Sequence, residues 1–199
     1  MAFVNSCSLI DSGAGLHDDD PLWISRDAKC QQIVERVIQN GAVLVRSPPV
    51  TGKSSMVTLI MQYTKKNHAN MAVYCVDFGA WNKTCDLGEY ITKSACDWDE
   101  AWRNSPTCQQ RTLFLLDETQ VLYELGKRHA FWQMIRKRMN SQNTDVAHVF
   151  VVLFATYGER PDVGGDSART PVSFTHAFGL DFLLFTEAEH AQQIGRAHV

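Results

Sequence analysis

The residues best suited to chemistry lie at positions 47–55, which read Ser-Pro-Pro-Val-Thr-Gly-Lys-Ser-Ser. An apolar run precedes this loop and a helical pattern follows it, the setting in which a Gly-Lys-Ser triplet indicates phosphate binding. Successive backbone N–H groups and the positive end of a helix dipole attract phosphate oxygens. The pattern therefore predicts that a nucleotide binds to the residues after the two prolines: Val50, Thr51, Gly52, Lys53, Ser54 and Ser55.

Two side chains of this loop have separate expected roles. The ammonium of Lys53 would reach the β- and γ-phosphates and act in catalysis, and the hydroxyl of Ser54 would bind Mg²⁺. Ser47 departs from the usual motif, which has a glycine at that position. The loop alone leaves open an ordinary turn before a helix that happens to contain Gly-Lys-Ser.

A pair of adjacent carboxylates, Asp117 and Glu118, follows the fully apolar run 113–116. Ligands of α/β sheets bind beyond the carboxyl ends of the strands, so these acids should lie at the same edge as the phosphate loop. Asp117 would bind Mg²⁺, and Glu118 would orient or deprotonate an attacking water. The pair might instead cap the next helix, but its place downstream of a phosphate loop favours the catalytic interpretation.

Hydrophobic periodicity predicts the elements that position these residues. Helical spacing of apolar residues begins at Asp27 and stops at Asn40-Gly41, and it returns from Lys53 to His68. Apolar runs predict buried strands at 42–46, 71–78, 113–116 and 148–154, and further helices at 87–95, 97–103 and 131–139. The expected fold is α/β: a three-layer P-loop NTPase sandwich with a mainly parallel five-stranded sheet. The strand before the phosphate loop should be central and lie beside the strand that ends in Asp117.

Aromatic and basic side chains outside the motifs have structural interpretations. Trp81, Trp98 and Trp102 are expected in the core or against a partner, because no basic residues interleave them densely. The basic cluster 136–138 is expected on a solvated helix face, with contact to nucleic acid as the alternative.

The polar residues after the fourth predicted strand would lie near the γ-phosphate. Thr156 or Tyr157 is a candidate sensor of that phosphate, and Arg160 might supply charge to the transition state or be a surface residue. Near the end of the chain, apolar segments lie at 171–174 and 182–185, and Thr186 is the expected N-cap of a helix.

Composition sets wide limits on function. The chain has 199 residues and a net charge of −3, which suits one α/β domain and disfavours nucleic-acid binding over the whole surface. The six cysteines contain no Cys-x-x-Cys pair, and the seven histidines have no metal-ligand spacing. No signal peptide or membrane span is recognisable, so an intracellular protein without membrane contact is expected.

Three regions are expected along the chain. Residues 1–20 are a flexible lead-in, residues 21–192 are the NTPase core, and residues 193–199 are an artefact. The final six residues, Ile-Gly-Arg-Ala-His-Val, match a translated sequencing adapter. The natural protein should therefore continue beyond Gln193.

Several separated segments resemble the Crinkler-type P-loop ATPases, which are AAA/STAND-like proteins. The segments are 46–55, the Walker B segment 116–123, Phe131-Trp132, 155–158 and 170–172, in the same order and at similar spacing. A serine at the first loop position is common in that group. The resemblance covers roughly residues 22–192 and implies an ATPase core with a Walker B glutamate. It also implies a C-terminal lid after that core, which is expected to be missing here.

The expected function is Mg²⁺-dependent binding and hydrolysis of ATP, or another NTP, as a switch or motor for effector domains. The alternatives are a nucleotide-binding scaffold without appreciable turnover and a nucleic-acid-handling ATPase. A small-molecule kinase is less favoured because no acceptor-site signature is present. Besides the nucleotide and Mg²⁺, possible partners are a second copy of the chain and an intramolecular effector domain.

Overall fold

The computed structural model describes residues 24–96, 98–102, 110–140, 147–156 and 170–191. Its centre is one five-stranded sheet in the order β2-β3-β4-β1-β5, and every strand pair is parallel. The strands are β1 (Ala42–Ser47), β2 (Met71–Asp77), β3 (Arg111–Asp117), β4 (Val149–Thr156) and β5 (Ala177–Phe178). The predicted α/β class and the five-stranded parallel sheet are confirmed.

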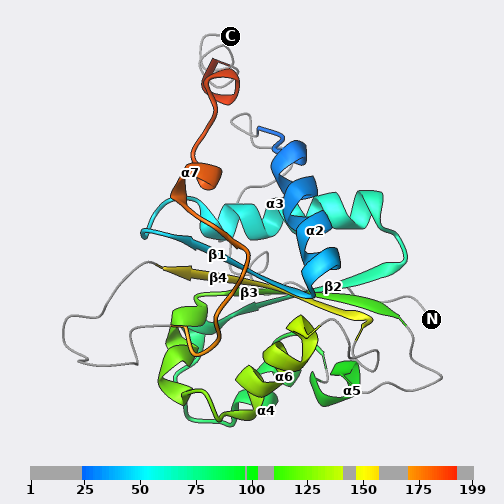
Figure 1. Ribbon diagram of the computed structural model, residues 1–199, viewed down its shortest axis with the longest axis vertical. Coiled ribbons are helices and arrows are strands. Elements are labelled where there is room, and N and C mark those ends of the chain that lie inside the picture. Colours follow the sequence, from blue (N-terminus) through cyan, green and yellow to red (C-terminus); the bar gives the residue numbers. More distant parts are fainter. Residues whose placement is uncertain (1–23, 97, 103–109, 141–146, 157–169, 192–199) are drawn as a thin grey trace.

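Helices cover both faces of this sheet (Figure 1). On one face lie α2 (Asp27–Asn40) and α3 (Lys53–Asn67), and the short α7 (Leu180–Leu183) packs near them. On the other face lie α4 (Leu87–Ser94), α5 (Trp98–Trp102) and α6 (Ala130–Met139). Two 3₁₀ helices, η1 (Phe78–Ala80) and η2 (Thr119–Leu125), follow β2 and β3 directly. The architecture is therefore a three-layer sandwich.

Side chains of the strands alternate between two hydrophobic clusters, one on each face of the sheet. In β1, Val43 and Val45 pack with α2 and α3, whereas Ala42 and Leu44 pack toward α6. The alternation arises because successive residues of a strand point to opposite faces. Both faces are covered, so the interior of each long strand is a continuous apolar run, and these runs made β1 to β4 recognisable in the sequence.

The tryptophans belong to the core on the α4–α6 face. Trp98 lies with its ring centroid 4.8 Å from that of Phe114 and 5.8 Å from that of Phe131. Trp81 and Trp102 are buried in the same cluster. The core interpretation of these three residues is confirmed.

The predicted position of β1 was wrong, because β1 is neither the central strand nor the neighbour of β3. β1 is not beside β3, because β4 lies between them and is the middle strand of the sheet. β4 can occupy this position because it is buried along almost its whole length, on both faces and both edges. The expected end of this strand was also too early, since Ala155 and Thr156 continue it.

The basic cluster 136–138 was expected on a solvent-exposed face of the helix, and this holds for only part of the cluster. Arg138 is buried, and its guanidinium donates to the carbonyl oxygens of Val149 and Ala147. Arg136 is half-buried and donates to the carbonyl oxygen of Pro171 at 3.1 Å, so Lys137 alone of the three is exposed. The side chains have this arrangement because helix α6 ends against β4 and residues 171–173. The cluster therefore does not form a continuous basic surface for nucleic acid.

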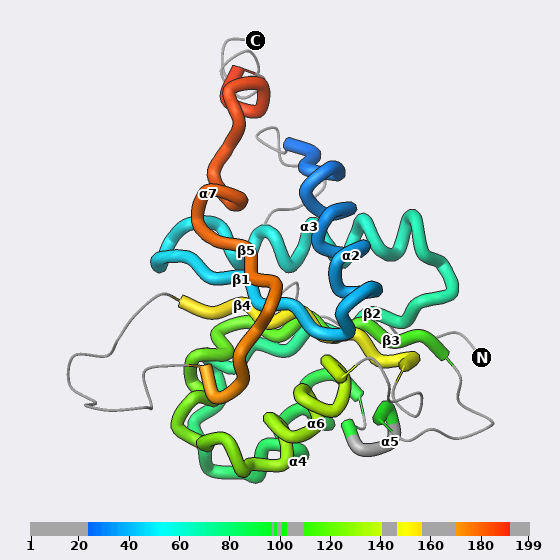
Figure 2. Tube along the Cα trace, viewed as in Figure 1, coloured from blue at the N-terminus to red at the C-terminus, as the bar shows by residue number. Residues whose placement is uncertain are grey.

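The C-terminal described segment packs against the start of α2 (Figure 2). The guanidinium of Arg26 donates to the carbonyl oxygens of Leu183 and Leu184, at 2.8 and 3.0 Å, and to the carboxylate of Glu189 at 3.0 Å. Residues 187–191 are helical, and the N–H of Glu189 donates to the Thr186 hydroxyl at 3.2 Å, which confirms Thr186 as an N-cap.

Glu189 is electrostatically stabilised at this junction. Burial by itself raises the pKa of its carboxyl. The N–H of Thr186 and the positive charges of Arg26 and Lys29 outweigh that effect and lower the pKa from 4.5 to about 2. Arg26 and Glu189 also form an ion pair with little exposure to solvent, so residues at opposite ends of the described chain are joined.

Two absences hold for the described residues. No helix among them is both long enough and apolar enough to cross a lipid bilayer. Nor do His, Cys, Asp and Glu side chains gather there in groups of three or more that would hold a metal ion. The expected regions 1–20 and 193–199 lie outside the described residues.

Candidate nucleotide-binding site

The predicted phosphate loop connects β1 to α3 at the carboxyl edge of the sheet. Gly52 adopts a left-handed conformation with φ 84° directly before the helix, and nothing lies within 4 Å of where its Cβ would be. Val50 also has a positive φ of 59° and is fully exposed. The first N–H groups of α3 have no acceptor within the helix, so they are available to bind an anion. The backbone therefore has the features of a phosphate-binding loop.

Ser47, where the usual motif has glycine, helps to hold this loop. Its hydroxyl is fully buried and shares a hydrogen bond with the hydroxyl of Thr51. Thr51 in turn donates to the carbonyl oxygen of Pro48 at 2.8 Å. The Ser47 hydroxyl also lies 3.4 Å from that oxygen, so either hydroxyl can be the donor between the two side chains. The departure at Ser47 thus has a structural role.

Lys53 lies at the start of α3 with only 5% of its surface exposed. Its ammonium donates to the carbonyl oxygens of Pro48 and Ser47, at 3.0 and 3.4 Å. A buried ammonium requires such partners, because burial of an unpaired charge is costly. Both partners belong to the loop, so the positive charge of Lys53 is held inside it.

Ser54 and Asp117 are brought into direct contact. The Ser54 hydroxyl donates to Oδ2 of Asp117 at 2.6 Å, across 63 residues of sequence. The contact crosses β4, because Ser54 follows β1 and Asp117 ends β3. The two predicted Mg²⁺ ligands are therefore neighbours in space.

Asp117 lies in a strongly desolvated position, with 1% of its surface exposed. Burial raises the pKa of its carboxyl, and the nearby carboxylates of Glu118 and Asp77 raise it further. The Ser54 hydroxyl and the N–H of Glu118 donate to it and oppose the rise. A cation beside Asp117 would relieve both the burial cost and the repulsion between carboxylates.

The donor set at this position fits Mg²⁺. The ion prefers hard oxygen ligands and commonly takes one or two from the protein, with phosphate oxygens and water completing its shell. A serine hydroxyl and a carboxylate 2.6 Å apart, at the N-terminus of a helix that can hold phosphate, supply those ligands.

Glu118 follows Asp117 in an unusual backbone conformation. Its φ of 53° and ψ of 36° are left-handed, so the chain turns sharply from β3 into η2. Non-glycine residues seldom adopt this conformation, and it recurs at functional positions. Because of this turn, the Glu118 side chain points in a different direction than it would if β3 continued through residue 118.

Two polar residues at the carboxyl edge of the sheet, Gln120 and Asp77, had no role predicted from the sequence. The amide of Gln120 contacts both Glu118 and the backbone N–H of Thr156. Asp77 ends β2 in register with Asp117 and accepts a hydrogen bond from the N–H of Gly79 at 2.8 Å. Asp77 was detectable in principle, because a carboxylate at the end of an apolar strand is the same signal that identified Asp117. Of the other candidates, Tyr157 and Arg160 lie outside the described residues.

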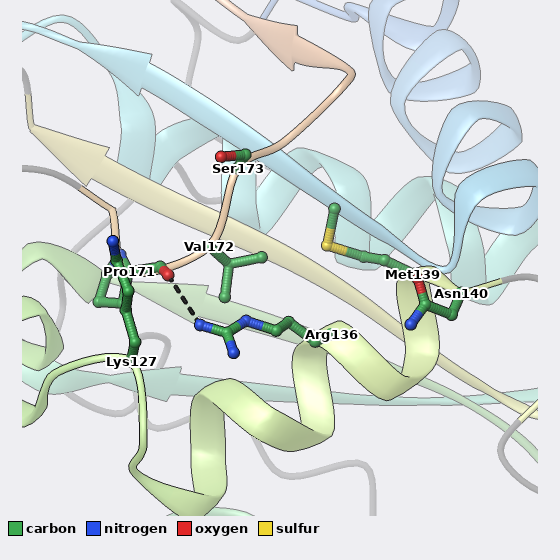
Figure 3. A pocket seen from close by; sticks show the side chains of 7 residues that line it. All are labelled: Lys127, Arg136, Met139, Asn140, Pro171, Val172 and Ser173. Carbon is green, nitrogen blue, oxygen red and sulfur yellow. Dashed lines mark hydrogen bonds between the residues drawn. The ribbon is translucent and has the colours of Figure 1, made fainter.

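A cavity of about 380 Å³ lies elsewhere, between α6 and residues 171–173 (Figure 3). Lys127, Arg136 and Asn140 contribute polar groups to its wall. None of the residues lining this cavity belongs to the phosphate loop or to the end of β3. The candidate nucleotide site is therefore a separate surface of the protein.

Comparisons with known proteins find likeness in solved structures alone: no protein-family model and no curated protein matches the sequence. The ORC2 protein of Aeropyrum pernix, solved in ADPNP-ADP complexes, matches 85% of this chain at 12% identity and a TM-score of 0.48. PCH-2 of C. elegans matches 81% of this chain at 16% identity and a TM-score of 0.43. The chain spans 50% and 44% of the lengths of those two chains.

These likenesses concern the fold, and we base the function proposed below on the residues of this chain. The all-parallel sheet in the order β2-β3-β4-β1-β5 has helices on both faces, and the predicted phosphate loop follows β1. The described part of the chain thus has a three-layer α/β fold with that loop at the carboxyl edge of its sheet.

Proposed function

We propose that this chain binds a nucleoside triphosphate together with Mg²⁺ and hydrolyses it. The observation that carries the proposal is the contact between Ser54 and Asp117. An ordinary turn before a helix gives no reason for a serine at its N-terminus to meet a buried carboxylate from a strand two positions away in the sheet. A shared metal ion gives that reason, because both oxygens are ligands that Mg²⁺ accepts.

In the proposed complex the backbone N–H groups from Val50 to Ser55 and the start of α3 bind the phosphates. The ammonium of Lys53 would exchange its loop carbonyls for the β- and γ-phosphates, where it offsets charge that backbone donors match less well. Mg²⁺ would be held by Ser54 and Asp117, and it would neutralise charge that develops on the phosphate oxygens. Glu118, next to Asp117, would orient or deprotonate the attacking water.

The nucleotide we propose is ATP, and the family we propose is the Crinkler-type group of P-loop ATPases. The support is the ordered set of segments from 46–55 to 170–172 in the sequence. As a Crinkler-type ATPase, the domain would act as a switch or motor. It would act on an effector domain, or within an assembly of several copies of the chain. Arg136 and Arg138 bind backbone carbonyl oxygens, so the nucleic-acid-handling alternative lacks the continuous basic surface that the cluster 136–138 suggested.

A nucleotide-binding scaffold without turnover is the second candidate. A measurement of turnover separates the two candidates.

Calorimetric titration with Mg-ATP tests the binding site. Lys53→Ala should weaken binding at least about tenfold, the scale of one charged hydrogen bond. Lys66→Ala is the matched control, because Lys66 is an exposed lysine at the far end of the same helix. Equal affinity of the folded Lys53→Ala variant and the control would refute the phosphate-loop assignment.

The metal ligands are tested by repeating the titration with and without Mg²⁺. Asp117→Asn should reduce the gain in affinity that Mg²⁺ provides while it leaves metal-free binding nearly unchanged. Equal losses under both conditions would mean that Asp117 serves the end of β3 and not a metal.

A further inference from the structure

The amide of Gln120 lies between the ends of two neighbouring strands. Its Nε2 donates to Oε2 of Glu118, directly after β3. Its Oε1 accepts from the backbone N–H of Thr156, the last residue of β4, at 3.1 Å. One side chain therefore ties the proposed catalytic carboxylate to the middle strand of the sheet.

The chemistry of the partners determines which way this amide faces. The backbone N–H of Thr156 can only donate, so it requires the amide oxygen of Gln120. The NH₂ group then faces Glu118 and donates to its carboxylate oxygen Oε2. Both hydrogen bonds therefore require the same orientation of the Gln120 amide. A glutamine side chain can make both bonds because its amide has a donor and an acceptor in one plane.

The rest of the Glu118 side chain is confined as well. A Cβ added to Gly79 would lie 3.4 Å from Cγ of Glu118 and 3.0 Å from Oδ1 of Asp77. Glu118 thus runs close to the backbone of η1 before its carboxylate meets Gln120. Among the described residues, Oε1 of Glu118 has no hydrogen-bond partner, in contrast to Oε2.

We propose that Gln120 is the positioning residue for Glu118 in the reaction, an inference that rests on the hydrolysis proposed above. By holding Oε2, Gln120 fixes the rotation of the carboxylate and leaves Oε1 as the oxygen that receives the proton of the attacking water. Gln120 gains its own fixed position from the N–H of Thr156. A displacement of a catalytic group by about 1 Å can cost a factor of about 100 in rate, so loss of this restraint should be measurable.

Two substitutions of Gln120 test this role through steady-state ATP hydrolysis. Gln120→Leu removes both hydrogen bonds at similar volume, and we expect kcat to fall about ten- to a hundredfold with KM within about twofold. Gln120→Glu keeps an acceptor for Thr156 but places a second carboxylate against Glu118, so it should reduce kcat at least as much. It also provides the test if Gln120→Leu fails to fold.

Gln133→Leu is the matched control. Gln133 is exposed and its amide donates to the carbonyl oxygen of Arg128 at 2.7 Å, away from the candidate site. This variant makes the same chemical change and should retain wild-type kcat and KM.

A double-variant comparison shows whether Gln120 acts through Glu118. Glu118→Gln alone should lower kcat by about a hundredfold or more. Adding Gln120→Leu to it should cause little further loss, because residues that act as a unit are not additive. A purely structural effect of Gln120→Leu would instead multiply with that of Glu118→Gln.

Each other outcome overturns a distinct part of the scheme. Wild-type kcat in both Gln120 variants, or multiplicative losses in the double variant, would overturn the role of Gln120 and leave the proposed hydrolysis intact. Turnover that survives Glu118→Gln would overturn the assignment of Glu118 and this inference with it. A wild type that binds Mg-ATP in the calorimeter and never hydrolyses it would overturn both hydrolysis and this role for Gln120, and would favour the scaffold.

Discussion

Gly41 provides a sharp test of how the strand that carries the phosphate loop is held. This residue links α2 to β1 with a φ of +77°, and a Cβ built there would lie 2.5–2.6 Å from Nη1, Cζ and the backbone oxygen of Arg138. Its carbonyl oxygen also accepts from the N–H of Val151 at 2.9 Å, next to the pairing of β1 with β4. A side chain at this position therefore meets two separate penalties.

The expected cost of Gly41→Ala is the sum of those penalties. Gly41 combines a φ of 77° with a ψ of −40°, a sparsely populated conformation that costs a non-glycine residue about 1–3 kcal/mol. Overpacking of a filled site costs about 1–3 kcal/mol, and one of the crowded atoms is backbone and cannot rotate away. The free energy of unfolding should therefore fall by about 2–6 kcal/mol.

Gly126→Ala is the control for a positive φ without crowding. Gly126 has a φ of +69°, its ψ is 168° where that of Gly41 is −40°, and nothing lies within 4 Å of the position of its Cβ. Non-glycine residues seldom adopt either conformation, so urea denaturation should give a loss of about 1–3 kcal/mol for Gly126→Ala and a larger loss for Gly41→Ala, which adds the overpacking. Equal losses would show that Arg138 does not crowd Gly41, and would refute the packing described at the end of α6.

Two further predictions concern ionisable groups. Because the folded-state pKa of Glu189 is lowered to about 2, its carboxylate stabilises the protein above pH 4.5, and this contribution is lost as the pH falls toward 2. The wild type should exceed Glu189→Gln in unfolding free energy by about 1 kcal/mol at pH 7 after screening, and this difference should vanish near pH 2. Glu187→Gln, at an exposed position, is the control. A difference that does not depend on pH, or one equal to that of the control, would contradict the ion pair between Glu189 and Arg26. Cys30 has 1% of its surface exposed, and burial raises the pKa of its thiol to about 12. A thiol reagent at about pH 8 should therefore modify Cys30 only when the protein unfolds, well after it modifies the partly exposed Cys85. Similar labelling rates of the two cysteines, measured by peptide mapping, would refute the burial of Cys30.

Local pattern was sufficient for most of the elements. The boundaries of α2 and α3 follow from helical spacing and from the stop signal at Asn40-Gly41, because helices are determined by residues near in sequence. β2 and β3 were recognisable because strands buried on both faces are continuously apolar. The phosphate loop and the acids after β3 could be placed at one edge of the sheet because both follow parallel strands.

Features that depend on distant contacts could not be predicted in this way. Nothing local in β1 states that its neighbour is β4 and not β3, since the order of strands depends on how whole layers pack. β5 has only two residues, too few for a periodic signal. Periodicity predicts on which side of a helix a side chain starts, and by this criterion Arg138 was expected on the surface. It does not show that the guanidinium at the end of the side chain reaches backbone carbonyl oxygens. The bridging amide of Gln120 likewise exists only when β3 and β4 are adjacent.

The place of β1 in the sheet also bears on the order in which the site can be built during synthesis. Ala42 pairs with Val151, about 110 residues later in the chain, and the other edge of β1 pairs with Ala177 and Phe178. Until those residues leave the ribosome, the strand that carries the phosphate loop has no native neighbour on either edge. Such long-range pairing slows folding and prolongs the exposure of apolar strand surface, so the first motif to be translated is among the last to be completed.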